Sequence, residues 1–122
     1  MPTPPVVAQF FRCMQAGAPS ADEMMSLFTE DAEYVEPFSG APTRHVGLAA
    51  IRRAMQAGWD QPLPAMTISI DRVDVDGQDV RAEWTCRSPA LPGGSGRGVN
   101  RYRLEHGRIS RLETTLVGGG GP

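Results

Sequence analysis

Residues 79–88, DVRAEWTCRS, give the clearest indication of the fold class. Ala82, Trp84 and Cys86 share one parity along it, and the residues between them are charged or polar. Because side chains alternate across a strand, this pattern predicts a strand with one buried face and one solvent-facing face.

Three further runs in the second half of the chain show similar alternation: residues 66–75, 97–105 and 108–117. Asp76-Gly77 and His106-Gly107 are tight-turn signals, and residues 89–96 form a longer loop rich in glycine and proline. Together they predict an antiparallel meander. The alternation slips near Asp71-Arg72, which predicts a β-bulge there.

The first half is helical in character. Apolar residues recur at helical spacing in segments 6–17, 20–28 and 47–59, and Ser20 with Glu23 is typical of a capping box. A short strand is expected over 32–37, followed by a loop over 38–45. Helices followed by a meander predict an α+β domain with the helices on one face of the sheet. We expect one domain over 1–117 and a flexible Gly-rich tail over 118–122.

Composition removes several classes of function. The chain has 122 residues, 40% hydrophobic and 21% charged, with a net charge of -2, which excludes a disordered chain and disfavours nucleic acid as the main partner. It lacks a run long enough for a membrane helix, and its first residues lack the basic segment of a signal peptide, so a cytoplasmic location without a membrane partner is expected. His45 and His106 lack metal-ligand spacing, and Cys13 and Cys86 flank no CxxC pattern. We therefore expect no metal, no cofactor and two buried thiols.

All twelve basic residues are arginine, so mechanisms that need a lysine side chain are excluded. Strand parity places most of the second-half arginines on the outward face, among Glu83 and Glu113. That face is either solvated or a dimer surface. The outward arginines are Arg81, Arg87, Arg97, Arg101, Arg103 and Arg111.

The inward face is mostly apolar with a few polar groups, which suits either a core or a small-molecule pocket. Glu36, next to Pro37, is its one candidate carboxylate and shares a face with Tyr34. The other inward polar candidates are Asn100, Ser110 and Thr114. The candidate pocket-lining residues are Phe10, Met14, Phe38, Met55, Trp59, Trp84, Tyr102, Leu112, Thr114 and Leu116.

Segments 6–17, 27–32, 35–37 and 47–52 closely resemble the first half of ketosteroid isomerases and, more broadly, the SnoaL-like branch of the NTF2-like superfamily. The resemblance implies a cone made of three helices on a strongly curved, mixed, mainly antiparallel sheet, often dimeric through the outer sheet face. It places Glu36 where those isomerases carry the aspartate that shuttles a proton. Phe10 falls at the position of an oxyanion-hole tyrosine, and Asn100 at that of a protonated aspartic acid.

Because Phe10 cannot donate a hydrogen bond, full steroid isomerase activity is not expected. The favoured hypothesis is an enzyme with Glu36 as general base, Asn100 as hydrogen-bond donor, and Tyr34 or Tyr102 assisting. Its substrate would be a hydrophobic carbonyl- or epoxide-bearing small molecule, isomerised or cyclised. Apolar enclosure predicts a raised pKa for Glu36, and His45 is expected to be an exposed loop residue.

Two alternatives remain. The first is a non-catalytic module that binds a small molecule or a partner, which the loss of the tyrosine at Phe10 supports. The second is an epoxide hydrolase of the kind that uses an Asp-Arg-Asp arrangement. The second is weakly supported, because Arg101 and Arg103 fall on the outward phase. A cyclase that opens an epoxide with one carboxylate stays open.

Overall fold

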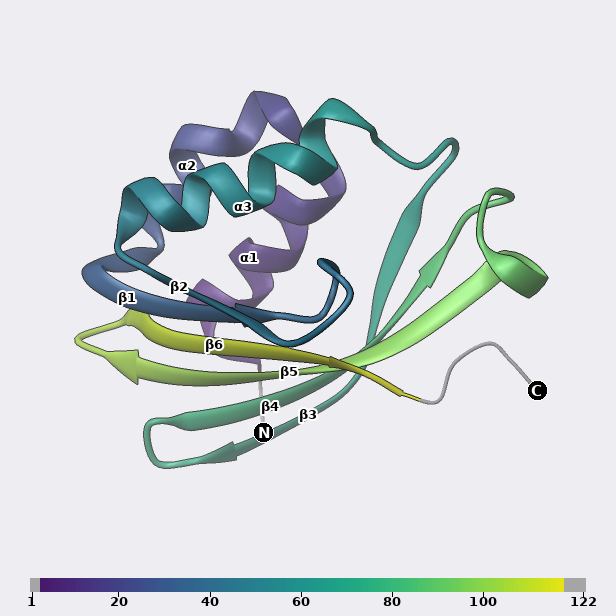
Figure 1. Cartoon of the computed structure of the whole chain (residues 1–122). Coiled ribbons are helices and arrows are strands. Elements are labelled where there is room, and N and C mark those ends of the chain that lie inside the picture. Colours follow the sequence, from purple (N-terminus) through teal and green to yellow (C-terminus); the bar gives the residue numbers. More distant parts are fainter. Residues whose placement is uncertain (1–2, 118–122) are drawn as a thin grey trace.

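The computed structural model describes residues 3–117, and the tail expected over 118–122 lies outside them. Helices come first and strands dominate the second half (Figure 1). The elements in chain order are α1 (Pro5–Ala16), a 3₁₀ turn (Ala18–Ser20), α2 (Ala21–Ser26), β1 (Phe28–Glu36), β2 (Thr43–Val46), α3 (Leu48–Asp60), β3 (Thr67–Asp76), β4 (Asp79–Arg87), a 3₁₀ turn (Pro92–Gly94), β5 (Ser95–Glu105) and β6 (Arg108–Leu116).

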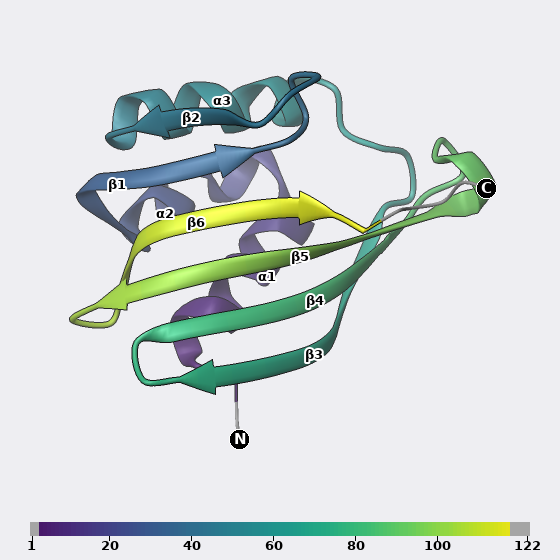
Figure 2. The same ribbon diagram turned by 60° about the horizontal axis from the view of Figure 1, so that its bottom comes forward.

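The strands form one sheet in the order β2-β1-β6-β5-β4-β3, with the three α-helices on one of its faces (Figures 1 and 2). β1 and β6 pair in parallel, and all other neighbours are antiparallel. The parallel pair arises because the α3 crossover and the β3–β5 meander separate β1 from β6 in the chain. This confirms the α+β architecture and the mixed sheet, whereas strong curvature of the sheet stays a prediction.

Three expectations about the first half are wrong. β1 begins at Phe28, so the polar residues 29–31 belong to a strand, and part of the segment expected as a loop forms β2. Edge pairing with β1 supplies the backbone hydrogen bonds that local propensity does not predict. The expected capping box is absent as well, because Ser20 makes no side-chain cap and Glu23 instead accepts a hydrogen bond of 2.9 Å from Gln9.

Side chains along the strands face inward and outward largely as the sequence pattern predicts, except at the start of β6. The register shift between Ile70 and Arg72 confirms the predicted bulge. A second shift, where β5 meets the start of β6, buries Ile109 completely and leaves Ser110 bonded to the backbone oxygen of Arg103. Ser110 is therefore not an inward-facing pocket residue, contrary to expectation, because this irregularity moves Ile109 into the core.

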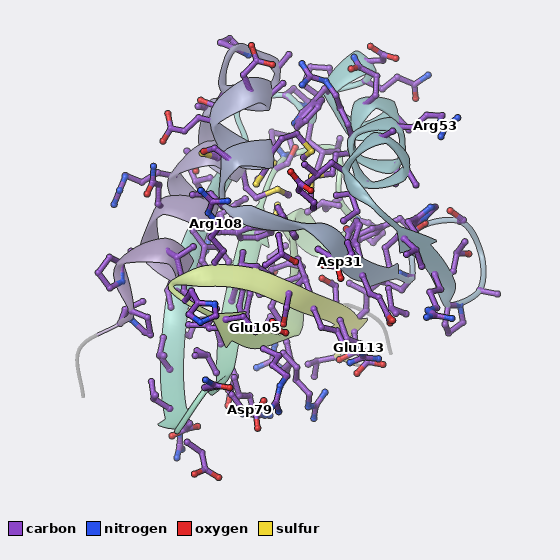
Figure 3. The ribbon with its side chains drawn as sticks, turned by 90° about the vertical axis from the view of Figure 1, so that its left-hand side faces the viewer. Asp31, Arg53, Asp79, Glu105, Arg108 and Glu113 are labelled. Atoms are coloured by element: carbon purple, nitrogen blue, oxygen red, sulfur yellow. The ribbon has the colours of Figure 1, made fainter. Side chains whose placement is uncertain are left out.

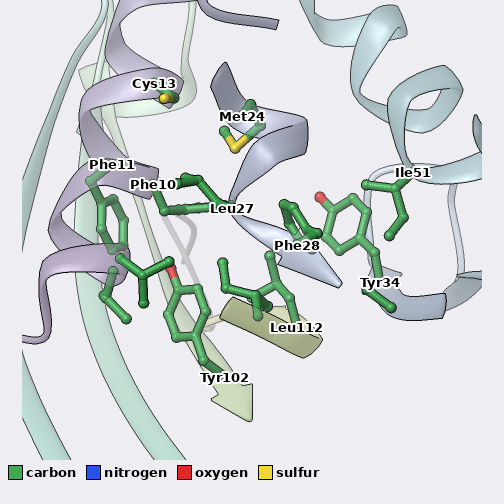
Figure 4. Close-up of a cluster of buried hydrophobic side chains, with 14 of the residues drawn as sticks. Phe10, Phe11, Cys13, Met24, Leu27, Phe28, Tyr34, Ile51, Tyr102 and Leu112 are labelled. Carbon is green, nitrogen blue, oxygen red and sulfur yellow. The ribbon is translucent and has the colours of Figure 1, made fainter. Parts of the chain in front are cut away.

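The core lies between the helices and the inner face of the sheet (Figure 4). α1 contributes Phe10, whose ring meets Tyr102 edge-on with centroids 5.5 Å apart. Cys13 and Cys86 are buried free thiols, as expected. Within residues 3–117, each helix is too short or too polar to cross a membrane.

The outer face of the sheet carries the charges, and Figure 3 shows Asp79 and Glu113 on the side away from the helices. Neighbouring side chains pair there, as in Arg103–Asp79 at 3.3 Å. A hollow of about 550 Å³ on this face is lined largely by charged residues. They are Asp74, Asp76, Asp79, Arg81, Arg101, Arg103 and Arg111.

Candidate functional site

Three polar side chains stand side by side on the inner face, on neighbouring strands. Val35 of β1 is opposite Glu113 of β6, so the next residues, Glu36 and Thr114, are neighbours, and Thr114 is in turn opposite Asn100 of β5. All three are buried. Two strand spacings separate Glu36 from Asn100, which puts their backbones roughly 10 Å apart. The structure thus brings together the two residues predicted to carry the chemistry.

Glu36 is held by four hydrogen bonds. The backbone N–H groups of Phe38 and Ser39 donate to Oε1 over 2.7 and 3.1 Å. The Ser39 hydroxyl donates to Oε2 over 2.8 Å, and Nε2 of His45 lies 2.8 Å from the same oxygen. This cradle forms because the chain turns immediately after Pro37 and returns along β2.

The expected rise in the pKa of Glu36 is wrong. Burial alone would raise it, but the hydrogen bonds from His45, Ser39 and the two backbone amides outweigh burial and hold the pKa of this carboxyl below its ordinary value. The expected apolar enclosure is also incomplete, since Phe38 is 61% exposed. Glu36 is therefore a buried, ionised carboxylate.

His45 lies elsewhere than expected. It lies in β2 directly opposite Tyr34, with ring centroids 6.1 Å apart, and not in an exposed loop. Its side chain is 22% exposed, against 6% for Glu36. Residues 37–42 are rich in turn-forming residues. This pattern could have predicted a hairpin that returns the chain, and His45 with it, beside Glu36.

Asn100 is the centre of a second polar cluster. Its Oδ1 accepts hydrogen bonds from Trp84 Nε1 over 3.0 Å and from the Thr114 hydroxyl over 2.8 Å, while Nδ2 donates to the Tyr102 hydroxyl over 2.9 Å. An amide nitrogen carries two hydrogens, and the second one has no hydrogen-bond partner among residues 3–117. Gly98 makes room for this arrangement, because the Trp84 ring lies where a Cβ on Gly98 would be.

Both inward tyrosines keep their phenol protons, because the pKa of each is raised. Their hydroxyls point from the sheet toward the helices (Figure 4). Burial, followed by the charge of Glu36, raises the pKa of Tyr34 despite an opposing hydrogen bond with Thr114. Burial likewise raises the pKa of Tyr102. Of the two tyrosines, Tyr34 is the one on the same strand as Glu36, two residues before it.

The remaining residues that were predicted to line the pocket differ in how deeply they are buried. Phe10, Met55, Leu112 and Tyr102 are buried in the core, and Met14, Trp59 and Trp84 are half-buried at its margin. Phe38 and Leu116 are exposed at the ends of β1 and β6, which run parallel and so finish at the same edge of the fold. The ends of β3, β4 and β5 project past the helices beyond this edge (Figure 1). The hollow of about 550 Å³ lies on the outer face, and the second described hollow, lined in part by Trp84, Gly98 and Val117, adjoins the end of β6. Neither is lined by Glu36 or Asn100, so the expected apolar inner cavity stays a prediction.

Helices on one face of this mixed sheet form the NTF2-like fold. Residues 7–112 match the family model described as SnoaL-like domain, and the chain belongs to that family. A comparison with curated proteins returns no match.

Solved structures share the fold at low identity. A candidate polyketide cyclase from Sinorhizobium meliloti is 22% identical, with a TM-score of 0.75 over 93% of this chain and 95% of its own. A candidate ketosteroid isomerase from Kribbella flavida is 18% identical, with a TM-score of 0.74 over 98% and 80%. TerC, co-crystallised with polyporic acid, is 18% identical, with a TM-score of 0.73 over 93% and 89%. Relatives of this chain thus include proteins named for cyclase and isomerase chemistry.

Proposed function

We propose that this protein is an enzyme that moves a proton on a hydrophobic carbonyl- or epoxide-bearing small molecule, in an isomerisation or a cyclisation. The general base is centred on Glu36. The observation that carries the proposal is the inner-face row in which this buried, ionised carboxylate shares one face with Asn100. Both reactions need a proton acceptor and a donor to the oxygen on which negative charge develops.

Asn100 supplies that donor through its second Nδ2 hydrogen, with Tyr34 as the assisting phenol. The amide is oriented by Trp84, Thr114 and Tyr102, so it needs little reorganisation when charge forms. Trp59 and Trp84 supply apolar surface at the margin of the core, and Phe38 and Leu116 supply it at the edge where β1 and β6 end. A compact hydrophobic molecule suits this combination better than a charged one.

The test is turnover of steroid-like, polyketide-like and terpenoid-like ketones and epoxides by the full chain. Glu36→Gln should lower turnover about 10²- to 10⁴-fold while ligand affinity changes little, because the amide keeps the shape but not the charge. Glu33→Gln is the matched control, since Glu33 is on the same strand and pairs with Arg44 at 2.7 Å on the outer face. Equal turnover in the wild type and Glu36→Gln would refute the proposal.

A non-catalytic binding module is the second candidate. It is supported by Phe10, a buried core residue at the position where the resembling isomerases carry a donor tyrosine. Its signature would be tight binding of phenols or ketones with no turnover of any compound in the panel.

We also propose that two copies associate through the outer sheet face. Arg101 has no ion pair among residues 3–117, and carboxylates such as Asp74 and Asp79 line the same hollow. A two-fold axis over this face would let guanidinium groups meet carboxylates of the partner. Sedimentation of the wild type and Arg101→Glu tests this: a dimer that Arg101→Glu weakens supports it, and a wild-type monomer refutes it.

A further inference from the structure

The hydrogen bonds around Glu36 leave it poorly suited to accept a proton itself. A carboxylate has about four lone-pair positions, and four donors occupy them here. Protonating Glu36 would force at least one of these donors to break away. The carboxylate is also covered, with a side chain only 6% exposed.

His45 has the complementary properties. An ionised carboxylate only accepts hydrogen bonds, so Nε2 of His45 must be the donor in the 2.8 Å contact with Oε2. In the neutral ring the lone pair then lies on Nδ1, which has no hydrogen-bond partner among residues 3–117. With 22% of its side chain exposed, His45 is the member of the pair that a ligand can reach.

We propose that Nδ1 of His45 is the atom that accepts the proton, and that Glu36 is the positioning residue that fixes the ring. This rests on the proposed function and changes one role within it. The carbon–hydrogen bond of the substrate breaks, its electron pair enters the enolate, and the proton forms a new N–H bond at Nδ1. His45 becomes an imidazolium beside the Glu36 anion, and the proton returns to the substrate at the carbon where the reaction ends.

The physical reason is the one that makes carboxylate–histidine pairs effective bases. The carboxylate fixes one tautomer and one ring orientation, and it stabilises the positive charge that forms on the ring. Ser39 and the two backbone N–H groups hold the carboxylate in turn. The closest alternative is that His45 is only one more donor that anchors an ordinary carboxylate base.

The first experiment needs no turnover. The full chain is labelled with ¹⁵N and mixed with a nitrophenol, whose absorbance distinguishes phenol from phenolate, and the ring nitrogens are followed by NMR. His106 is the only other histidine and is exposed in the β5–β6 turn, so His45→Gln and His106→Asn assign the signals. Asn tolerates the positive φ of 52° at position 106.

Ionisation of the bound phenol together with imidazolium shifts of the His45 ring is the expected result. Ionisation with a neutral His45 ring would overturn this inference and leave the proposed function standing, because the proton would then have passed to an acceptor other than Nδ1. Failure of the probe to bind or to ionise counts against the proposed function, and this inference falls with it.

The second experiment uses turnover on a substrate found with the panel above. His45→Gln should lower turnover at least as much as Glu36→Gln, the double variant should be no slower than His45→Gln alone, and His106→Asn should match the wild type. A loss of less than about tenfold in a folded His45→Gln protein, with Glu36→Gln far slower, would show that His45 only anchors the carboxylate.

Discussion

The glycine at position 98 gives a sharp test of the inner-face packing. The backbone of Gly98 in β5 is opposite Trp84 in β4, and a Cβ built on Gly98 would overlap atoms of the indole ring. Gly98→Ala must therefore displace either the strand or the ring. Displacing the ring breaks the 3.0 Å hydrogen bond from Trp84 Nε1 to Asn100.

The cost follows from two terms. Overpacking of a well-packed site costs about 1–3 kcal/mol, and loss of one hydrogen bond adds about 1 kcal/mol. We expect Gly98→Ala to lower the free energy of unfolding by about 2–4 kcal/mol. For a domain of this size the melting temperature should fall by roughly 3–6 °C per kcal/mol.

Two other glycines give matched controls for the same chemical change. Gly96 is in the same strand and would meet only Leu91 at 4.0 Å, and Gly58 in α3 would meet nothing within 4 Å. Gly96→Ala should be nearly neutral, and Gly58→Ala should stabilise by about 0.5–1 kcal/mol because alanine favours the helix. Urea unfolding of the three variants measures this. If the Gly98→Ala variant is no less stable than the Gly96→Ala variant, the packing argument is refuted.

The remaining predictions concern Glu36 and Phe38. Because the pKa of Glu36 is lower in the folded protein than its ordinary value of 4.5, its stabilising contribution is complete above that value and is lost as pH falls through the folded pKa. Urea unfolding from pH 7 to 3 should thus show the stability gap between the wild type and Glu36→Gln narrowing below about pH 4.5; a gap independent of pH would contradict it. Phe38→Ala should change the free energy of unfolding by less than about 0.5 kcal/mol, because the ring is 61% exposed, yet weaken binding of a hydrophobic ligand about tenfold. Calorimetric titration checks the binding, and unchanged affinity would remove Phe38 from the site.

Local patterns in the sequence were sufficient for most of the sheet. The alternation over 79–88 correctly placed Ala82 and Cys86 inside, and the slip at Asp71-Arg72 correctly marked the bulge. Such patterns are reliable because successive side chains of a strand point to opposite faces. They failed at Ser110, where the irregular pairing with β5 moved Ile109 inward.

For the candidate site, the strand pattern was enough to predict an inward carboxylate at Glu36 and an inward amide at Asn100 on one sheet face. How that carboxylate behaves depends on contacts that form only in the folded chain. The return of β2 beside β1 brings His45 to 2.8 Å from Glu36, and the intervening turn adds Ser39 and two backbone donors. The pKa of Glu36 therefore falls although the residue is buried. The direction of this pKa shift depends on hydrogen-bond donors that strand pairing brings close to Glu36. The sequence of the strand itself predicts only that the residue is buried.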